Sequence, residues 1–309
     1  MIQQFNSLLE MLKAFPDEQT CIDHFTAIRW AGKPHCPYCG VDNIYHFADK
    51  RTHKCGGCRK RFTIRVGTIF ESSKIPLQKW FMAIYLCTSH KKGISSIQLG
   101  KDIGVTQKSA WFMLHRLRHA SQTRSFNQPL LTGTVEIDET YMGGKERNKH
   151  ASKRMKHTQG RSTKTKTPVL GMLERGGELR LFKVENTSRE TIMPIIDRNI
   201  GSNASIFTDE AHAYRSLAER FRHQSINHSR KEYVFGDVHT NSIEGAWSLF
   251  KRGILGIQHH VSKKHLDRYL DEFTFRYNSR NQTEGERVNN LLSQIGGRLT
   301  YKGLINGGQ

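Results

Sequence analysis

The spacing of apolar residues changes along the chain, and each change indicates a different kind of element. In the first 30 residues, apolar side chains recur at helical spacing, at Phe5, Leu8, Leu9, Leu12 and Phe15. Pro16 and Asp17 interrupt this pattern, and residues 18–30 are expected to form a second short helix. We interpret residues 1–30 as helices whose role is packing.

The rest of the chain predicts a multidomain α+β protein. Short strand-like runs occur at 44–47 and 61–64, and helical periodicity returns over 76–120. From Thr134, strand and helix patterns alternate, whereas the chain beyond about Gln282 is polar and loses its periodicity. The expected parts are N-terminal helices (1–30), a small strand-containing segment (31–70), a helical segment (71–125), an α/β domain (130–281) with a basic insert (142–168), and a C-terminal extension (282–309).

The composition adds a large positive charge to this picture. The 309 residues include 48 Lys or Arg and 28 Asp or Glu, so the formal net charge is +20. Such a surplus predicts attraction to polyanions, but it does not separate DNA from RNA or catalysis from coating. No stretch approaches the roughly 18 apolar residues of a membrane span, and no signal-peptide pattern opens the chain. We expect a cytoplasmic, nucleoid-associated protein without a membrane partner.

Four of the six cysteines form two matched pairs. Cys36 and Cys39 are separated by two residues, and Cys55 and Cys58 repeat that spacing after 15 intervening residues. Four thiolates in two tight turns suit a tetrahedral structural zinc ion, so we predict a zinc ribbon with four cysteine ligands. DNA is the favoured partner of this ribbon, because it carries Lys50, Arg51, Lys54, Arg59, Lys60, Arg61 and Arg65. The remaining cysteines, Cys21 and Cys87, are expected to be core residues.

The helical segment has capping and turn residues at the positions expected of a helix-turn-helix. Ser95 can cap a short helix, Gly104 can supply the turn, and Thr106 can cap the next helix, which spans 107–120. A capped basic helix after such a turn is typical of DNA recognition in the major groove, and an ordinary helical hairpin is the alternative. The candidate DNA contacts on this helix are Lys108, Arg116 and Arg118.

The α/β domain begins with an acidic strand. Residues 134–141 alternate apolar and acidic positions and include Asp138. Two further strands, 169–174 and 179–184, flank a Gly176-Gly177 hairpin signal, and residues 187–190 fit a helix capping box. A strand over 204–209 then ends in Asp209, and a helix is expected over 210–220. This order fits a ribonuclease-H-like sheet, in which Asp138 and Asp209 lie side by side.

A third acid can come from a later helix. Residues 241–252 read as a helix, on which Glu244 and Lys251 are two turns apart and share one face. Carboxylates of this kind suit two hard divalent ions, Mg²⁺ or Mn²⁺, and Lys251 could hold a phosphate beside them. Four other acids are interpreted as structural or as supporting the metal ligands: Glu136, Glu139, Glu210 and Asp237.

These residues resemble a known family, the DDE transposases of bacterial insertion sequences of the ISXO-like type, which are related to the Merlin elements. The resemblance extends over about 20–300, and the motifs that carry it are 135–145, 207–214, 239–251 and 266–280, together with the cysteine pairs and 93–99. It implies metal binding by Asp138, Asp209 and Glu244, with Asn241 as an alternative third ligand. It also implies that Lys251 matches the basic residue that follows the third ligand.

The implied reaction is hydrolysis at the ends of the element, followed by attack of the freed 3′-hydroxyl on target DNA. The expected partner is double-stranded DNA, and a homodimer or larger assembly is expected because two ends must be held together. Two other classes remain: a DNA-binding regulator without catalysis, and a ribonuclease-H-like nuclease without strand transfer.

The basic insert is the remaining unusual segment. Residues 145–166 contain nine Lys or Arg and a single acid, Glu146. The segment is either a solvated loop or an arm that becomes ordered on DNA. Lys153 and Arg154 are its candidate DNA contacts.

Overall fold

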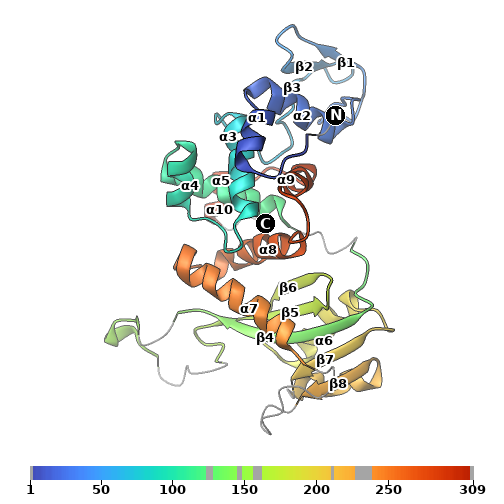
Figure 1. The fold of residues 1–309 in the computed structure, drawn as a ribbon, viewed down its shortest axis with the longest axis vertical. Helices are drawn as coiled ribbons and strands as arrows, with labels where there is room; N and C mark the ends of the chain where they lie inside the picture. The colour runs from blue at the N-terminus through green and yellow to red at the C-terminus, as the bar shows by residue number, and fades with distance from the viewer. Residues whose placement is uncertain are drawn as a thin grey trace. The chain divides into compact units, whose positions relative to one another are not determined.

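The chain divides into two compact units. The computed structural model describes residues 3–122, 128–144, 148–155, 162–209, 212–226 and 239–306. One unit, called the head unit here, comprises Met1–Gln122 and Ser279–Gln309, and the other, the sheet unit, comprises Thr123–Asn278 (Figure 1).

The head unit contains helices and a small antiparallel sheet of three strands. Its helices are α1 (Leu8–Ala14), α2 (Glu18–Trp30), α3 (Leu77–Ser89), α4 (Ser96–Ile103), α5 (Gln107–Ala120), α9 (Glu284–Ser293) and α10 (Tyr301–Asn306). Its strands are β1 (Ile44–His46), β2 (Thr52–Cys55) and β3 (Arg61–Thr63). The strand runs predicted at 44–47 and 61–64 correspond to β1 and β3. Helix α2 begins at the predicted residue because Asp17 and Thr20 form a reciprocal capping box.

The predicted turn between α4 and α5 is present in detail. The Ser95 side chain accepts a hydrogen bond from the backbone N–H of Gln98, and the Thr106 side chain accepts one from Ser109. Gly104 ends α4 in the left-handed conformation with φ of 62°, which glycine adopts without steric cost. These three residues therefore set the ends of both helices, as their order in the sequence predicts.

The C-terminal segment differs from the expectation of an aperiodic extension. It forms α9 and α10, and it belongs to the head unit although it follows the sheet unit in sequence. The backbone N–H of Gly285 donates to Phe5 O over 2.8 Å, and Asn289 bonds to His24. Helices this short give a weak periodic signal, but the Thr283–Glu286 capping box that begins α9 is visible in the sequence.

The sheet unit is built on five strands in the order β6-β5-β4-β7-β8. They are β4 (Thr134–Met142), β5 (Thr167–Glu174), β6 (Leu179–Lys183), β7 (Ser205–Asp209) and β8 (Arg222–Ile226). The first three strands are antiparallel neighbours, and β4 pairs in parallel with β7, which pairs in parallel with β8. The four predicted strands are present, with the strand of Asp138 beside the strand of Asp209 as expected, and β8 adds a fifth strand at the edge.

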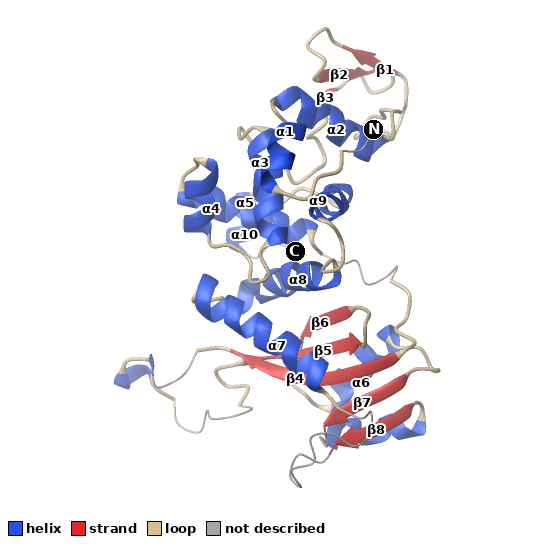
Figure 2. Ribbon diagram, viewed as in Figure 1, coloured by secondary structure: helices blue, strands red, loops and turns tan. Residues whose placement is uncertain are grey.

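Helices cover both faces of this sheet (Figure 2). Helix α6 (Arg189–Asn199) packs on one face, where its apolar side chains join those of β4, β5 and β7. Helices α7 (Asn241–Gly253) and α8 (Leu266–Asn278) form a second core on the other face. The other helical segments are the 3-10 helices η3 (Ala151–Lys153), η4 (His212–Glu219) and η7 (Lys263–His265) and the π-helix η6 (Ile254–Gln258).

One local expectation in the sheet unit is wrong. The capping box predicted at 187–190 does not form: Ser188 is the N-cap of α6 and makes no side-chain capping bond. Instead, Asn186 Oδ1 accepts from the backbone N–H of Ser188 and the hydroxyl of Thr191. The helix expected over 210–220 is present over His212–Glu219, where it has 3-10 geometry.

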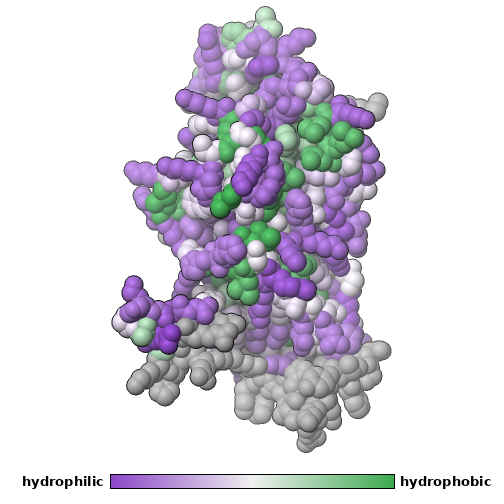
Figure 3. Space-filling view, turned by 60° about the vertical axis from the view of Figure 1, so that its left-hand side comes forward, coloured by the Kyte–Doolittle hydropathy of each residue, from purple (hydrophilic) through white to green (hydrophobic). Residues whose placement is uncertain are grey.

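The molecular surface is mainly hydrophilic on the face shown in Figure 3, where hydrophobic residues form small separate patches. In the described part of the chain, no helix combines the length and the apolar character needed to cross a membrane.

Candidate metal centres and acidic site

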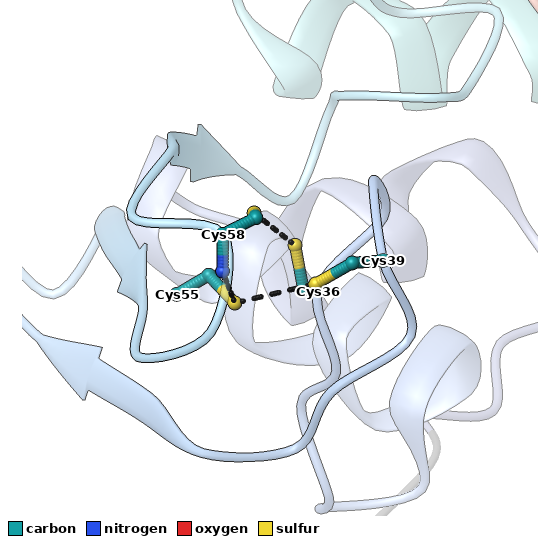
Figure 4. Close-up of side chains that lie close together, drawn as sticks. All are labelled: Cys36, Cys39, Cys55 and Cys58. Carbon is teal, nitrogen blue, oxygen red and sulfur yellow. Dashed lines mark hydrogen bonds between the residues drawn. The ribbon is translucent and has the colours of Figure 1, made fainter.

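The four paired cysteines converge in the head unit. Cys36 Sγ lies 3.6 Å from Cys58 Sγ, and Cys39 Sγ lies 3.5 Å from Cys55 Sγ (Figure 4). All four sulfur atoms lie within 4.8 Å of one another. Zn–S bonds of about 2.3 Å in a tetrahedron place the sulfur atoms about 3.8 Å apart. The four thiols therefore fit a zinc ion.

The other two cysteines lie away from this cluster, as expected of core residues. Cys21 and Cys87 are both buried. Burial raises the pKa of the Cys21 thiol to about 12, so that it stays protonated at neutral pH.

In the sheet unit, Asp138 and Asp209 come from adjacent strands. The β4–β7 register pairs Glu136 with Phe207, and continuing it by two residues on each strand places Asp138 beside Asp209. One carboxylate oxygen from each, together with one from Glu139, lies within 4.8 Å of the others. Oxygen atoms at these separations can share a hard divalent cation.

The environment of Asp138 disfavours its ionised form, because the side chain is buried beside two other carboxylates. Burial raises the pKa of Asp138 to about 7, and the charges of Glu139 and Asp209 add to this effect. Glu244 acts in the same direction more weakly. A bound cation would reverse this balance, because it stabilises the ionised carboxylates.

Glu139 is the site residue that the sequence interpretation placed outside the metal ligands. Its Oε1 accepts a 2.6 Å hydrogen bond from the hydroxyl of Tyr214, which is fully buried in η4. The signal available in the sequence was the direct adjacency of Asp138 and Glu139 within an acidic strand. Glu136, by contrast, is buried in an ion pair, in keeping with its structural interpretation. Glu210 and Asp237 lie outside the described residues.

Helix α7 brings Glu244 towards Asp138 without joining it to the cluster. Within the ranges that the structure describes, the carboxylates that meet at 4.8 Å are Asp138, Glu139 and Asp209, and Glu244 is not among them. Glu244 is exposed in the first turn of α7, where Thr240 Oγ1 donates to its Oε1 over 3.1 Å. Asn241, the alternative third ligand, is exposed in the same turn, and Lys251 is exposed two turns further along.

The path of α7 is set by a glycine in the sheet. Gly171 of β5 pairs with Asp138 of β4, and paired residues present their side chains on the same face. A Cβ atom at Gly171 would lie 2.5 Å from Cζ2 of Trp247, so only glycine admits the helix this closely. The first half of α7 therefore lies over the strand pair that carries Asp138.

The candidate DNA contacts divide into exposed and buried residues. Lys108, Lys153 and Arg154 are exposed. Arg116 and Arg118 are only 6% and 1% exposed, so their assignment as direct DNA contacts is corrected. Arg116 donates to Ile69 O and Leu299 O, within the interior of the head unit. Part of the basic insert, 145–147 and 156–161, lies outside the described residues.

The chain combines a four-cysteine ribbon with an α/β sheet that carries an acidic cluster. Proteins of known families share both parts. The sequence profile of the ISXO2-like transposase domain matches residues 130–278, and that of the transposase zinc-ribbon domain matches residues 16–61. The chain belongs to the ISXO2-like transposase family.

Two relatives support this membership. The chain is 31% identical over 277 residues to a Halobacterium salinarum protein described as belonging to transposable element ISH50, covering 86% of this chain and 92% of that protein. It is 30% identical over 97 residues to a transposase-like protein of Haemophilus influenzae, covering 31% of this chain and 77% of that protein. A crystal structure of a pre-cleavage Mos1 transpososome matches 74% of this chain and 82% of its own, with 13% identity and a TM-score of 0.28. A TM-score this low does not establish a common fold.

Proposed function

We propose that this protein is the DDE-type transposase of an insertion sequence, which cleaves DNA at the element's ends and transfers the freed 3′-hydroxyl into target DNA. The observation that carries the proposal is the convergence of Asp138, in the middle of β4, and Asp209, at the end of the adjacent β7, in a chain of a transposase family. Asp138, Asp209 and Glu244 would hold two divalent ions, Mg²⁺ or Mn²⁺. The cysteines would hold a structural Zn²⁺.

The residues around the site have separable roles in this reaction. When bound, the divalent ions activate the attacking oxygen and stabilise the leaving oxygen. Asp138 and Asp209 supply ligands from two strands held in register, while Glu244 approaches from α7. Lys251 lies two turns beyond Glu244 on the exposed side of α7, where its ammonium group can hold a phosphate. Glu139 is supported by Tyr214 and adds negative charge beside the ions.

We assign DNA contacts to exposed basic residues of both units. On the zinc-ribbon sheet, the exposed Arg61 of β3 pairs with the half-buried Lys54 of β2. Lys108 is exposed in the first turn of α5, the second helix of the proposed helix-turn-helix. Lys153 and Arg154 are exposed in the insert, which fits an arm that contacts the DNA backbone. Because two element ends must be joined in one reaction, the active form is proposed to be a homodimer or a larger assembly on DNA.

A strand-transfer assay tests the proposal. The purified full chain, linear DNA carrying the sequences that flank its gene, and a supercoiled target are incubated with Mg²⁺ or Mn²⁺. Joined product that Asp138→Asn abolishes supports the transposase. Asp197→Asn serves as the matched control, since Asp197 forms a surface ion pair with Arg220 in the same unit, and it should remain active. Cleavage without joining would identify a nuclease, and binding without cleavage would identify a regulator.

A further inference from the structure

We propose that Glu136 and Arg175 are positioning residues, which together set the places of the three elements that carry Asp138, Asp209 and Glu244. The inference rests on the proposed function for its consequence in catalysis. Its structural part is independent of catalysis: a buried ion pair in the sheet fixes the start of helix α7.

Glu136 caps α7 from the sheet. Its carboxylate is fully buried, and its Oε2 accepts a 2.9 Å hydrogen bond from the backbone N–H of Ile243. Ile243 is the third residue of α7, where N–H groups have no partner inside the helix. The N-cap residue, Thr240, makes no side-chain capping bond. A negative charge at this end also favours the helix dipole, so Glu136 performs the capping that the helix's own sequence does not.

Arg175 connects Glu136 to two further segments. Its Nε donates to Glu136 Oε1 over 2.7 Å, and one terminal nitrogen donates to His239 O over 2.9 Å. Its guanidinium carbon lies 4.8 Å from the centroid of the Phe207 ring. His239 Nδ1 also lies 3.3 Å from Glu136 Oε1. One arginine therefore contacts β4, β7 and the residue that leads into α7.

The partners of this ion pair stand close in sequence to the acids. Glu136 precedes Asp138 by two residues on β4, and Phe207 precedes Asp209 by two on β7. Because strand side chains alternate, residues two apart share a face of the sheet. Ile243 directly precedes Glu244 on α7. A displacement at the Glu136–Arg175 pair is thus transmitted over one or two residues to each of the three acids.

Metal-dependent phosphoryl transfer is sensitive to such displacements. Ligands must be held within about 0.5 Å of the productive geometry, and outer residues that orient ligands typically matter by about 10–100-fold in metal affinity or activity. Asp138 and Asp209 are fixed by the strand register itself. Glu244 is on a separate element, so it depends most on the contact between Glu136 and Ile243.

The first test does not need activity. Glu136→Gln keeps the size of the side chain but removes its charge, and hydrogen exchange is followed residue by residue in the full chain. We expect faster exchange at the first amides of α7, by at least about tenfold, with β4 and β5 unchanged. The matched control is Glu272→Gln, because Glu272 is a buried glutamate paired with Arg276 on α8. Unchanged exchange at the start of α7, or equal loss throughout the sheet unit, would overturn the positioning role.

The second test separates positioning from general stability. Mn²⁺ affinity is measured by calorimetry in Glu136→Gln, Glu244→Gln and the double variant. We expect Glu136→Gln alone to weaken Mn²⁺ binding about tenfold or more and to have no further effect in the Glu244→Gln background. Equal losses in both backgrounds would show that Glu136 does not act through Glu244. Failure of the wild-type chain to bind Mn²⁺ would refute the proposed function instead, while leaving the exchange result intact.

Discussion

The hydroxyl of Tyr214 donates a 2.6 Å hydrogen bond to Oε1 of Glu139, and this bond connects the segment after β7 to the middle of β4. Asp209 is the last residue of β7, and Tyr214 follows it in η4. The segment that begins at Asp209 therefore holds both carboxylates that lie beside Asp138. Asp209 belongs to this segment, and Glu139 is bound to it through Tyr214.

The first prediction concerns this bond. Tyr214→Phe should lower the free energy of unfolding by about 2 kcal/mol, because a hydrogen bond to a charged carboxylate is lost in a buried setting. Tyr141→Phe is the control, since its hydroxyl makes a longer, 3.3 Å contact with the Thr187 hydroxyl. Urea denaturation of the metal-free protein measures both. Equal stability of Tyr214→Phe and wild type would show that solvent replaces the bond.

The second prediction follows from the pKa of Asp138, which burial raises from 3.8 to about 7 in the folded protein. The folded state then holds this proton more tightly than the unfolded state. The stabilisation is complete below about pH 4 and is lost as pH rises through about 7. The metal-free protein should therefore have a lower free energy of unfolding at about pH 8 than at about pH 5, and Mg²⁺ should restore stability at the higher pH.

Denaturation at both pH values checks this dependence. Asp138→Asn should reduce the difference between the two pH values, whereas Asp267→Asn, which alters an exposed ion pair with Lys183, should not. A pH dependence that is the same in Asp138→Asn as in wild type would assign it to other groups.

The third prediction concerns zinc. Each chain should release one zinc ion to a chromogenic chelator, and Cys55→Ser should release none because a tetrahedral site tolerates the loss of a thiolate poorly. Cys87→Ser is the matched control, since Cys87 is also buried but lies outside the cluster. It should retain zinc even where it is less stable. Full zinc content in Cys55→Ser would contradict the four-cysteine assignment.

The fourth prediction separates two basic residues of α5. Lys108→Ala should weaken DNA binding and reduce its dependence on salt by about one phosphate contact, without a change in stability. Arg116→Ala should instead lower the free energy of unfolding by about 2 kcal/mol or more, because it removes buried hydrogen bonds to Ile69 O and Leu299 O. Filter binding over a salt series and urea denaturation distinguish the two. Reversed effects would place Arg116, rather than Lys108, on the DNA.

The arginines show where the sequence interpretation reached its limit. Arg116 and Arg118 lie on a basic helix and look like DNA contacts in the sequence. In the folded head unit they are buried, and the segment that accepts the Arg116 hydrogen bond at Leu299 lies 183 residues away. A helical pattern reports which residues share a face, but not which distant segment covers that face.

The acidic site shows a similar division. The strand patterns place Asp138 and Asp209 together, because parallel neighbours in register bring equivalent positions side by side. The patterns do not reveal that Glu139 joins them or that Glu136 caps α7, since both relationships depend on contacts between segments far apart in the chain.

By itself, the sequence determined the features that depend on nearby residues: the caps Ser95 and Thr106, the Gly104 turn, the cysteine pairs and the strands that carry Asp138 and Asp209. These are set by backbone hydrogen bonds and side-chain alternation within a few positions. Only the tertiary structure decided which charges are buried, that the C-terminal helices complete the head unit, and how the sheet holds the start of α7. Those outcomes depend on which segments, distant in sequence, pack together and exclude water, and the spacing of nearby residues does not determine this packing.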